Sequence, residues 1–160
     1  MPAEYKVDGN QKLDMLGSPF GPPGTRKVFS GLAKVLTADD NGALCLWTTA
    51  AGYLYTLPAA QLGLWFDFLV HTTITSVGAK VICATGDFLV GSFIQSPDST
   101  TLLAAHAADG STHVSWNGNG TTTGGYAGDF FRVTAISSTQ WVIQGLGLAT
   151  GTEATPFAAS

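Results

Sequence analysis

Nine short segments rich in aromatic and β-branched residues dominate the chain beyond Gly31, and they constrain its fold more than any other feature. Segments of this length and composition are typical of β-strands. Clusters such as ADDNG, ADGS and NGNG separate them and supply the residues that tight turns require. The predicted strands are residues 32–37, 43–48, 53–58, 64–70, 79–84, 88–94, 112–116, 130–136 and 140–146. This pattern predicts an all-β chain that forms a β-sandwich or a jelly-roll-like domain.

Residues 64–70 indicate which side of a strand faces the core. Alternate positions of this segment carry Leu64, Phe66, Phe68 and Val70. Side chains two apart lie on the same face of a strand, so this face is predicted to be buried, with Trp65 and Asp67 on the other. Residues 99–109 (STTLLAAHAAD) are compatible with a short helix capped by Asp98 or Ser99, or with a strand.

The first 30 residues differ from the rest of the chain. They show no sustained strand or helix period, and GSPFGPPGTRK places three prolines and three glycines close together. Prolines remove backbone donors and bias the preceding residue toward extended conformations. A length of 160 residues is sufficient for one domain with a core of its own. We therefore predict an extended N-terminal arm over residues 1–30 and one sandwich domain over residues 31–160, with a short C-terminal tail.

Charge and hydropathy exclude several classes of partner. The net charge is -4 and the pI is near 5.0, whereas a nucleic-acid-binding protein presents a basic face. Five of the seven basic residues lie in the first 34 positions. No apolar run reaches 18 residues, and the N-terminus is too polar for a signal peptide. The sequence predicts neither a nucleic-acid nor a membrane partner and indicates a protein made in the cytoplasm.

The residues that carry chemistry do not form a recognisable motif. The glycine-rich stretch GNGTTTGG lacks the spacing of a phosphate-binding loop and leads into a predicted strand instead of a helix. His71, His106 and His113 have no metal-ligand spacing, and Asp39–Asp40–Asn41 reads as a turn. Most acids after Lys34, among them Asp87 and Asp129, fall in turns, as capping or solvated groups do. We predict no catalytic residues, no cofactor and no metal site, and therefore no enzyme.

The two cysteines, Cys45 and Cys83, lie inside apolar segments. We expect them to be buried free thiols.

Two stretches resemble a family of phage structural proteins. NGTTTGGYAGDFFRVTAISSTQWVIQG with the later TGTEATPFA, and the earlier LTADDNGALCLWTTAAGYLYTLPAAQLGLWFDFLV, are similar to head decoration (cement) proteins of tailed bacteriophages. The resemblance covers residues 36–158. It implies an all-β homotrimer on the outer surface of the virion head that clamps neighbouring copies of the major capsid protein against the pressure of packaged DNA.

Under this hypothesis the arm is the candidate for capsid binding. Phe20 and Phe29 are the predicted apolar anchors, and Arg26 and Lys27 are the predicted charge contacts. An arm that becomes ordered on a partner loses conformational entropy, so aromatic burial should contribute more than surface ion pairs.

Two other functions remain open. A carbohydrate-binding or receptor-binding sandwich could use Trp47, Trp65 and Trp116 as sugar platforms, although core or trimer-interface positions are favoured for these residues. A phage tail or fibre component is the other alternative, because similar Thr/Gly-rich hairpins occur there.

Overall fold

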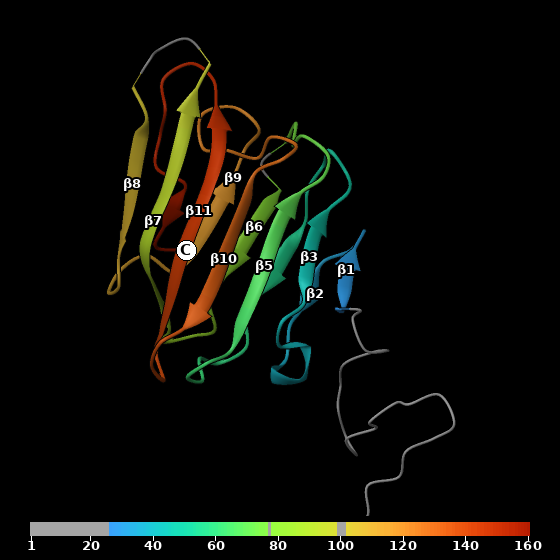
Figure 1. Cartoon of the computed structure of the whole chain (residues 1–160), viewed down its shortest axis with the longest axis vertical. Coiled ribbons are helices and arrows are strands. Elements are labelled where there is room, and N and C mark those ends of the chain that lie inside the picture. The colour runs from blue at the N-terminus through green and yellow to red at the C-terminus, as the bar shows by residue number, and fades with distance from the viewer. Residues whose placement is uncertain (1–25, 77, 99–101) are drawn as a thin grey trace, which may run out of the picture.

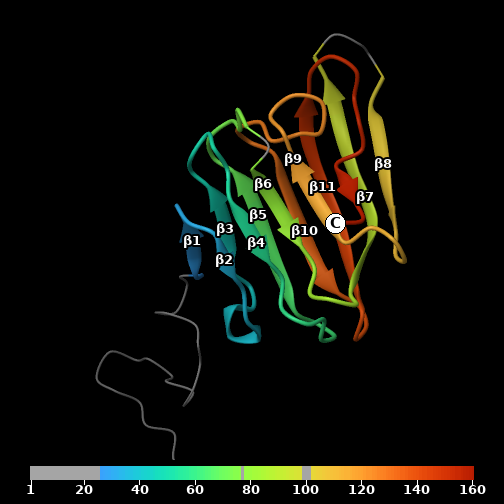
Figure 2. The ribbon, with the colours of Figure 1, turned by 180° about the vertical axis from the view of Figure 1, so that it is seen from behind.

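Two β-sheets pack face to face in the computed structural model, which describes residues 26–76, 78–98 and 102–160 (Figure 1). The predicted all-β sandwich is confirmed. In spatial order the larger sheet contains β1 (Val28–Ser30), β3 (Leu44–Trp47), β5 (Trp65–Val70), β10 (Phe130–Ala135), β11 (Gln140–Ala149), β7 (Phe88–Pro97) and β8 (Ala104–Asp109). The smaller sheet, seen from behind in Figure 2, contains β12 (Phe157–Ala158), β9 (Ser115–Gly118), β6 (Ala79–Ile82), β4 (Leu54–Thr56) and β2 (Lys34–Val35).

The first six strands wind back and forth between the two sheets. β1, β3 and β5 are parallel neighbours in the seven-stranded sheet, and β2, β4 and β6 are parallel neighbours in the five-stranded sheet. β7 and β11 also pair in parallel, over ten residues. A jelly roll is built from antiparallel Greek keys, so this winding is a different topology within the same two-layer architecture.

Each of the nine predicted strands overlaps an observed one, and β7, β9 and β11 extend beyond the predicted segments. Of the three remaining strands, β1 and β12 were not predicted, and β8 forms where a helix and a strand were both open. Residues 99–109 were compatible with a helix or a strand. Within them, Ala104–Asp109 forms the strand β8. β1 lies within the predicted arm, and β12 lies in the predicted C-terminal tail, where it pairs with β9. The predicted turn after Thr37 is a 3-10 helix, η1 (Ala38–Asp40). No helix in the described part of the chain is long and apolar enough to cross a membrane.

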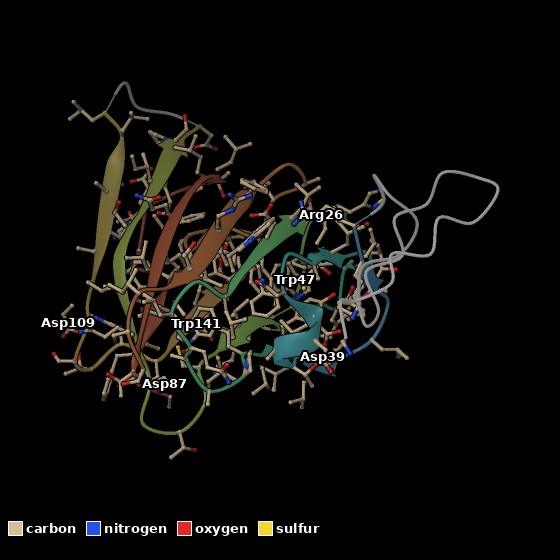
Figure 3. All side chains as sticks on the ribbon, turned by 60° about the horizontal axis from the view of Figure 1, so that its bottom comes forward. Arg26, Asp39, Trp47, Asp87, Asp109 and Trp141 are labelled. Carbon is tan, nitrogen blue, oxygen red and sulfur yellow. The ribbon has the colours of Figure 1, made fainter. Side chains whose placement is uncertain are left out.

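Aromatic side chains fill the space between the sheets. Trp47, Trp116 and Phe131 are fully buried, and the Trp116 and Phe131 rings lie 4.6 Å apart between centroids. The predicted alternation in β5 is confirmed for Phe66 and Phe68, which point into this core. Figure 3 shows Trp47 within the sandwich, whereas the labelled aspartates lie toward its periphery. Large rings such as these make most of the contact between the two sheets.

Both cysteines are buried and unpaired, as predicted. Burial raises the pKa of the Cys45 and Cys83 thiols to about 12. The thiolate is the reactive form, so both thiols are expected to be inert in the folded protein at neutral pH. Thiol titration should detect fewer than about 0.1 reactive thiols per chain in buffer and two in denaturant. Rapid modification in buffer would show that the sandwich opens at these positions.

Candidate interaction surface

The seven-stranded sheet presents an apolar row on its outer face, the face turned away from the five-stranded sheet. Strand register places six apolar residues side by side across six strands. We call them the outer row: Leu46, Leu69, Phe130, Leu146, Ile94 and Ala105. Phe130 and Leu146 are 41% and 64% exposed, respectively. Water-facing strand positions are usually polar, so this row is a candidate contact surface.

A shallow pocket of about 330 Å³ adjoins the outer row. It is lined by Ile94, Ser96, Leu103, Ala127, Gly128, Asp129, Leu146, Gly147 and Leu148. Leu103 and Leu148 are 66% and 48% exposed and extend the apolar surface beyond the row. A pocket with this lining can receive an apolar side chain.

Asp129, a buried residue that lines the pocket, fixes the glycine-rich loop. Its Oδ2 accepts backbone N–H bonds from Gly125 (2.7 Å) and Tyr126 (3.1 Å), and its Oδ1 accepts one from Leu148 (2.9 Å). Burial raises the pKa of Asp129 and outweighs the opposing effect of these three bonds. The carboxylate thus joins the loop to β11, and the stretch GNGTTTGG is a joint between strands, as its spacing indicated.

Asp67 is the centre of a polar cluster beside the outer row, two residues before Leu69 on β5. Arg132 donates two bonds to it, Nε to Oδ1 (2.7 Å) and Nη2 to Oδ2 (2.9 Å), and Arg26 donates from Nη1 to Oδ2 (2.9 Å). Both guanidinium groups also lie near the Trp65 ring, at 4.2 Å for Arg132 and 5.3 Å for Arg26. Burial alone would raise the pKa of Asp67, but the hydrogen bonds from the two arginines hold it below its ordinary value. Such bidentate, charge-assisted pairs fix geometry strongly.

The predicted capsid contacts that the structure describes already have partners within the chain. Arg26 is bound to Asp67, and Lys27 donates to the backbone oxygen of Asp39 (2.6 Å) and to Asp40 Oδ1 (3.2 Å). Phe29 packs against the core, with the Lys34 ammonium 4.2 Å from its ring centroid. The structure therefore brings these three residues together as an anchor for the start of the sandwich. Phe20 lies outside the described residues.

A second group of exposed apolar residues lies at the edge of the sandwich formed by β1 of the larger sheet and β2 of the smaller sheet (Figures 1 and 2). Strand register places Val28 on the outer side of the seven-stranded sheet and Val35 on the outer side of the five-stranded sheet, with Leu32 in the connection between them. Val28, Leu32 and Val35 are 52%, 79% and 68% exposed. We call these three residues the edge patch. It lies in the same stretch as the predicted contacts but uses the side chains that point to solvent.

Two of the three tryptophans considered as sugar platforms are unsuitable for that role. Trp47 and Trp116 are fully buried in the core. Trp65 is half-buried, with the two arginines of the Asp67 cluster near its ring. A stacked sugar needs an open aromatic face. These positions give no support to a carbohydrate site.

The three histidines have different neighbours and do not contact one another. His71 is exposed, and His113 lies beside Asp109 and Phe157. His106 Nε2 lies 2.9 Å from Gln95 Oε1, and burial lowers the pKa of its imidazole although Glu153 opposes this. Across residues 26–76, 78–98 and 102–160, no three His, Cys, Asp or Glu side chains gather closely enough to hold a metal ion.

Comparison with known proteins finds no matching family model, no similar curated protein and no similar solved structure.

Sequence reasoning did not find the outer row, although a signal was present. The segments FFRVTAI and QWVIQGLGLA carry apolar residues on both faces of a strand. Such segments are typical of strands that are covered on both sides. Which residues on different strands become neighbours depends on register, which no single segment contains.

Proposed function

We propose that this chain is a virion structural protein that decorates the outside of a tailed-phage head as a homotrimer and binds the major capsid protein. The observation that carries the proposal is the presence of two groups of exposed apolar residues on one charge-poor sandwich, one across the outer face and one around the β1 and β2 edge. A subunit of a decorating oligomer needs two kinds of contact, one with its own copies and one with the capsid. The outer row and the edge patch supply two such surfaces. The sequence resemblance directs the proposal toward phage heads.

The edge patch is the capsid contact within this proposal. It begins two residues after Arg26, so it is continuous with the anchor that joins residues 1–25 to the domain. Its side chains are exposed, while Arg26, Lys27 and Phe29 are engaged within the chain. Exposed apolar residues release more free energy on burial than ion pairs at a solvated surface. We assign Arg26, Lys27 and Phe29 to anchoring and not to the capsid contact.

Replacing Leu32 with serine should weaken head binding at least about 10-fold, because burying a leucine contributes about 1.5 to 3 kcal/mol. Leu62→Ser is the matched control, since Leu62 is 80% exposed and lies outside the edge patch. Both proteins would be mixed with purified empty heads and, separately, with tails, and the bound fraction measured by co-sedimentation. Sedimentation of the free protein would give its oligomeric state.

The outcomes separate the candidate functions. Binding to heads that is lost in Leu32→Ser and kept in Leu62→Ser supports the proposal. Binding to tails alone would make the protein a tail or fibre component. Equal head binding by both variants would remove the edge patch from the contact, and a monomer at micromolar concentration would remove the trimer.

A further inference from the structure

The start of the described chain lies on the same outer face as the outer row. The Arg26 side chain reaches Asp67, an outward position of β5, and also donates to the backbone oxygens of Gly42 (2.9 Å) and Ala43 (3.0 Å). Three hydrogen bonds and the nearby Trp65 ring fix its position. The described chain therefore begins at this face.

We propose that residues 13–20 (LDMLGSPF) of the same chain dock across the outer row, with one of their apolar side chains in the pocket beside Leu148. The proposal concerns the outer face alone and does not depend on the edge patch or on a phage head. With residues 13–20 docked, the covered row, and not the bare row, is the surface that meets other copies of the chain in the proposed trimer.

Chain length permits this contact. Phe20 lies six residues before Arg26 and can reach about 20 Å from it, and Leu13 can reach about 43 Å. The outer row spans five strand spacings, about 24 Å from Leu46 to Ala105. Residues 13–20 can therefore cover much of the row without any movement of the Arg26 anchor.

The chemistry of the two surfaces matches. Residues 13–20 contain Leu13, Met15, Leu16 and Phe20 and only one charge, on Asp14. The outer row is uncharged and the pocket is lined mainly by apolar groups, while Asp67, Arg26 and Arg132 on this face are paired with each other. Burial of apolar surface is therefore the interaction that residues 13–20 and the outer row can form with each other.

Tethering favours the same copy as the source of the segment. A short tether gives an effective concentration on the order of millimolar, which exceeds that of a second copy in dilute solution. A contact that is weak between separate molecules is then occupied within one molecule. The inference is thus an intramolecular contact and not an exchange between subunits.

Disulfide trapping in the full-length chain tests this contact. The test protein carries Leu16→Cys with Leu148→Cys, and the control carries Leu16→Cys with Leu54→Cys. Leu54 is exposed on the outer side of the five-stranded sheet, close to the β1 and β2 edge, so it controls for simple proximity of a tethered cysteine. Cys45 and Cys83 stay in place because both are buried. Ala105→Cys is a second position on the row, should Leu148→Cys disturb the pocket.

Mild oxidation at low micromolar concentration should form the intramolecular disulfide at least about 10-fold faster in the test protein than in the control. Peptide mapping under non-reducing conditions would identify the bond. Equal rates at Leu148 and Leu54, or no bond with either Leu148 or Ala105, would overturn the proposal. A disulfide that joins two chains would overturn the intramolecular assignment and name a second copy as the source. Because no head is present, these outcomes are independent of those for head binding.

Discussion

Replacing Gly120 with alanine is expected to destabilise the sandwich by about 4 kcal/mol, or to prevent folding, through steric overlap added to backbone strain. A Cβ at this position would lie 1.6 Å from the backbone oxygen of Ile74 and 2.6 Å from its carbonyl carbon. The φ angle of Gly120 is +73°, which side-chain-bearing residues adopt only with strain. The obstacle is backbone, so no side chain can rotate to relieve it. Urea denaturation gives the change in unfolding free energy.

Gly128→Ala is the matched control for this variant. Gly128 also has a positive φ, +101°, but a Cβ there would meet no atom within 4 Å. It should lose only the conformational part, about 1 to 2 kcal/mol. If Gly120→Ala and Gly128→Ala lose equal stability, the close approach of the loop to Ile74 is not what restricts position 120 to glycine.

Replacing Asp67 with alanine should destabilise the protein by about 3 kcal/mol at neutral pH, because two arginines lose a shared buried partner. The Asp67 side chain is 3% exposed, whereas the Arg26 and Arg132 side chains are 37% and 48% exposed. Water can reach the arginines after the change, which keeps the loss below that of a fully buried pair. Asp39→Ala is the control, since Asp39 is exposed, and it should change stability by no more than about 0.5 kcal/mol.

The Asp67 contribution should also depend on pH in one direction. Its pKa in the folded protein lies below the ordinary value of 3.8, so the folded state holds this proton less tightly than the unfolded state. The stabilisation is then fully present above pH of about 4 and is lost as the pH falls below it, toward the folded pKa. Denaturation of the wild type and Asp67→Ala at pH 7 and pH 3 should show a smaller difference at pH 3. An equal difference at both pH values would mean that packing, and not charge, holds Asp67.

The strands were predictable because their evidence is local. Each of the nine predicted segments is short, rich in β-branched or aromatic residues and bounded by turn residues, and each overlaps an observed strand. β1 and β12 escaped because VFS and FA are too short to show alternation. For β8, AAHAAD, a helix and a strand both stayed open because alanine has little strand propensity. Pairing with β3, β7 and β9 holds them, and pairing is a tertiary property.

The acidic residues also show which features were predictable from local sequence and which depended on tertiary structure. The turn positions of Asp87 and Asp129 indicated capping, and both accept backbone N–H bonds, Asp87 from Ala60 at 2.7 Å and Asp129 from three donors. Both are nevertheless buried, where solvated groups were an equal expectation. The alternation in β5 placed Asp67 on the outer face correctly. Only the approach of Arg26 from the start of the chain and of Arg132 from β10 explains why it is buried there.

The candidate sites also combine features that local sequence determined with features that only strand order and register determined. Local composition and alternation by themselves determined the strands, the two-layer class, the buried cysteines and the role of the glycine-rich stretch as a joint. Tertiary structure alone decided that Arg26, Lys27 and Phe29 anchor the chain to its own domain, and that six apolar residues from six strands form one row. Side-chain neighbours across a sheet are set by strand order and register, which bring together residues as distant as Leu46 and Leu146.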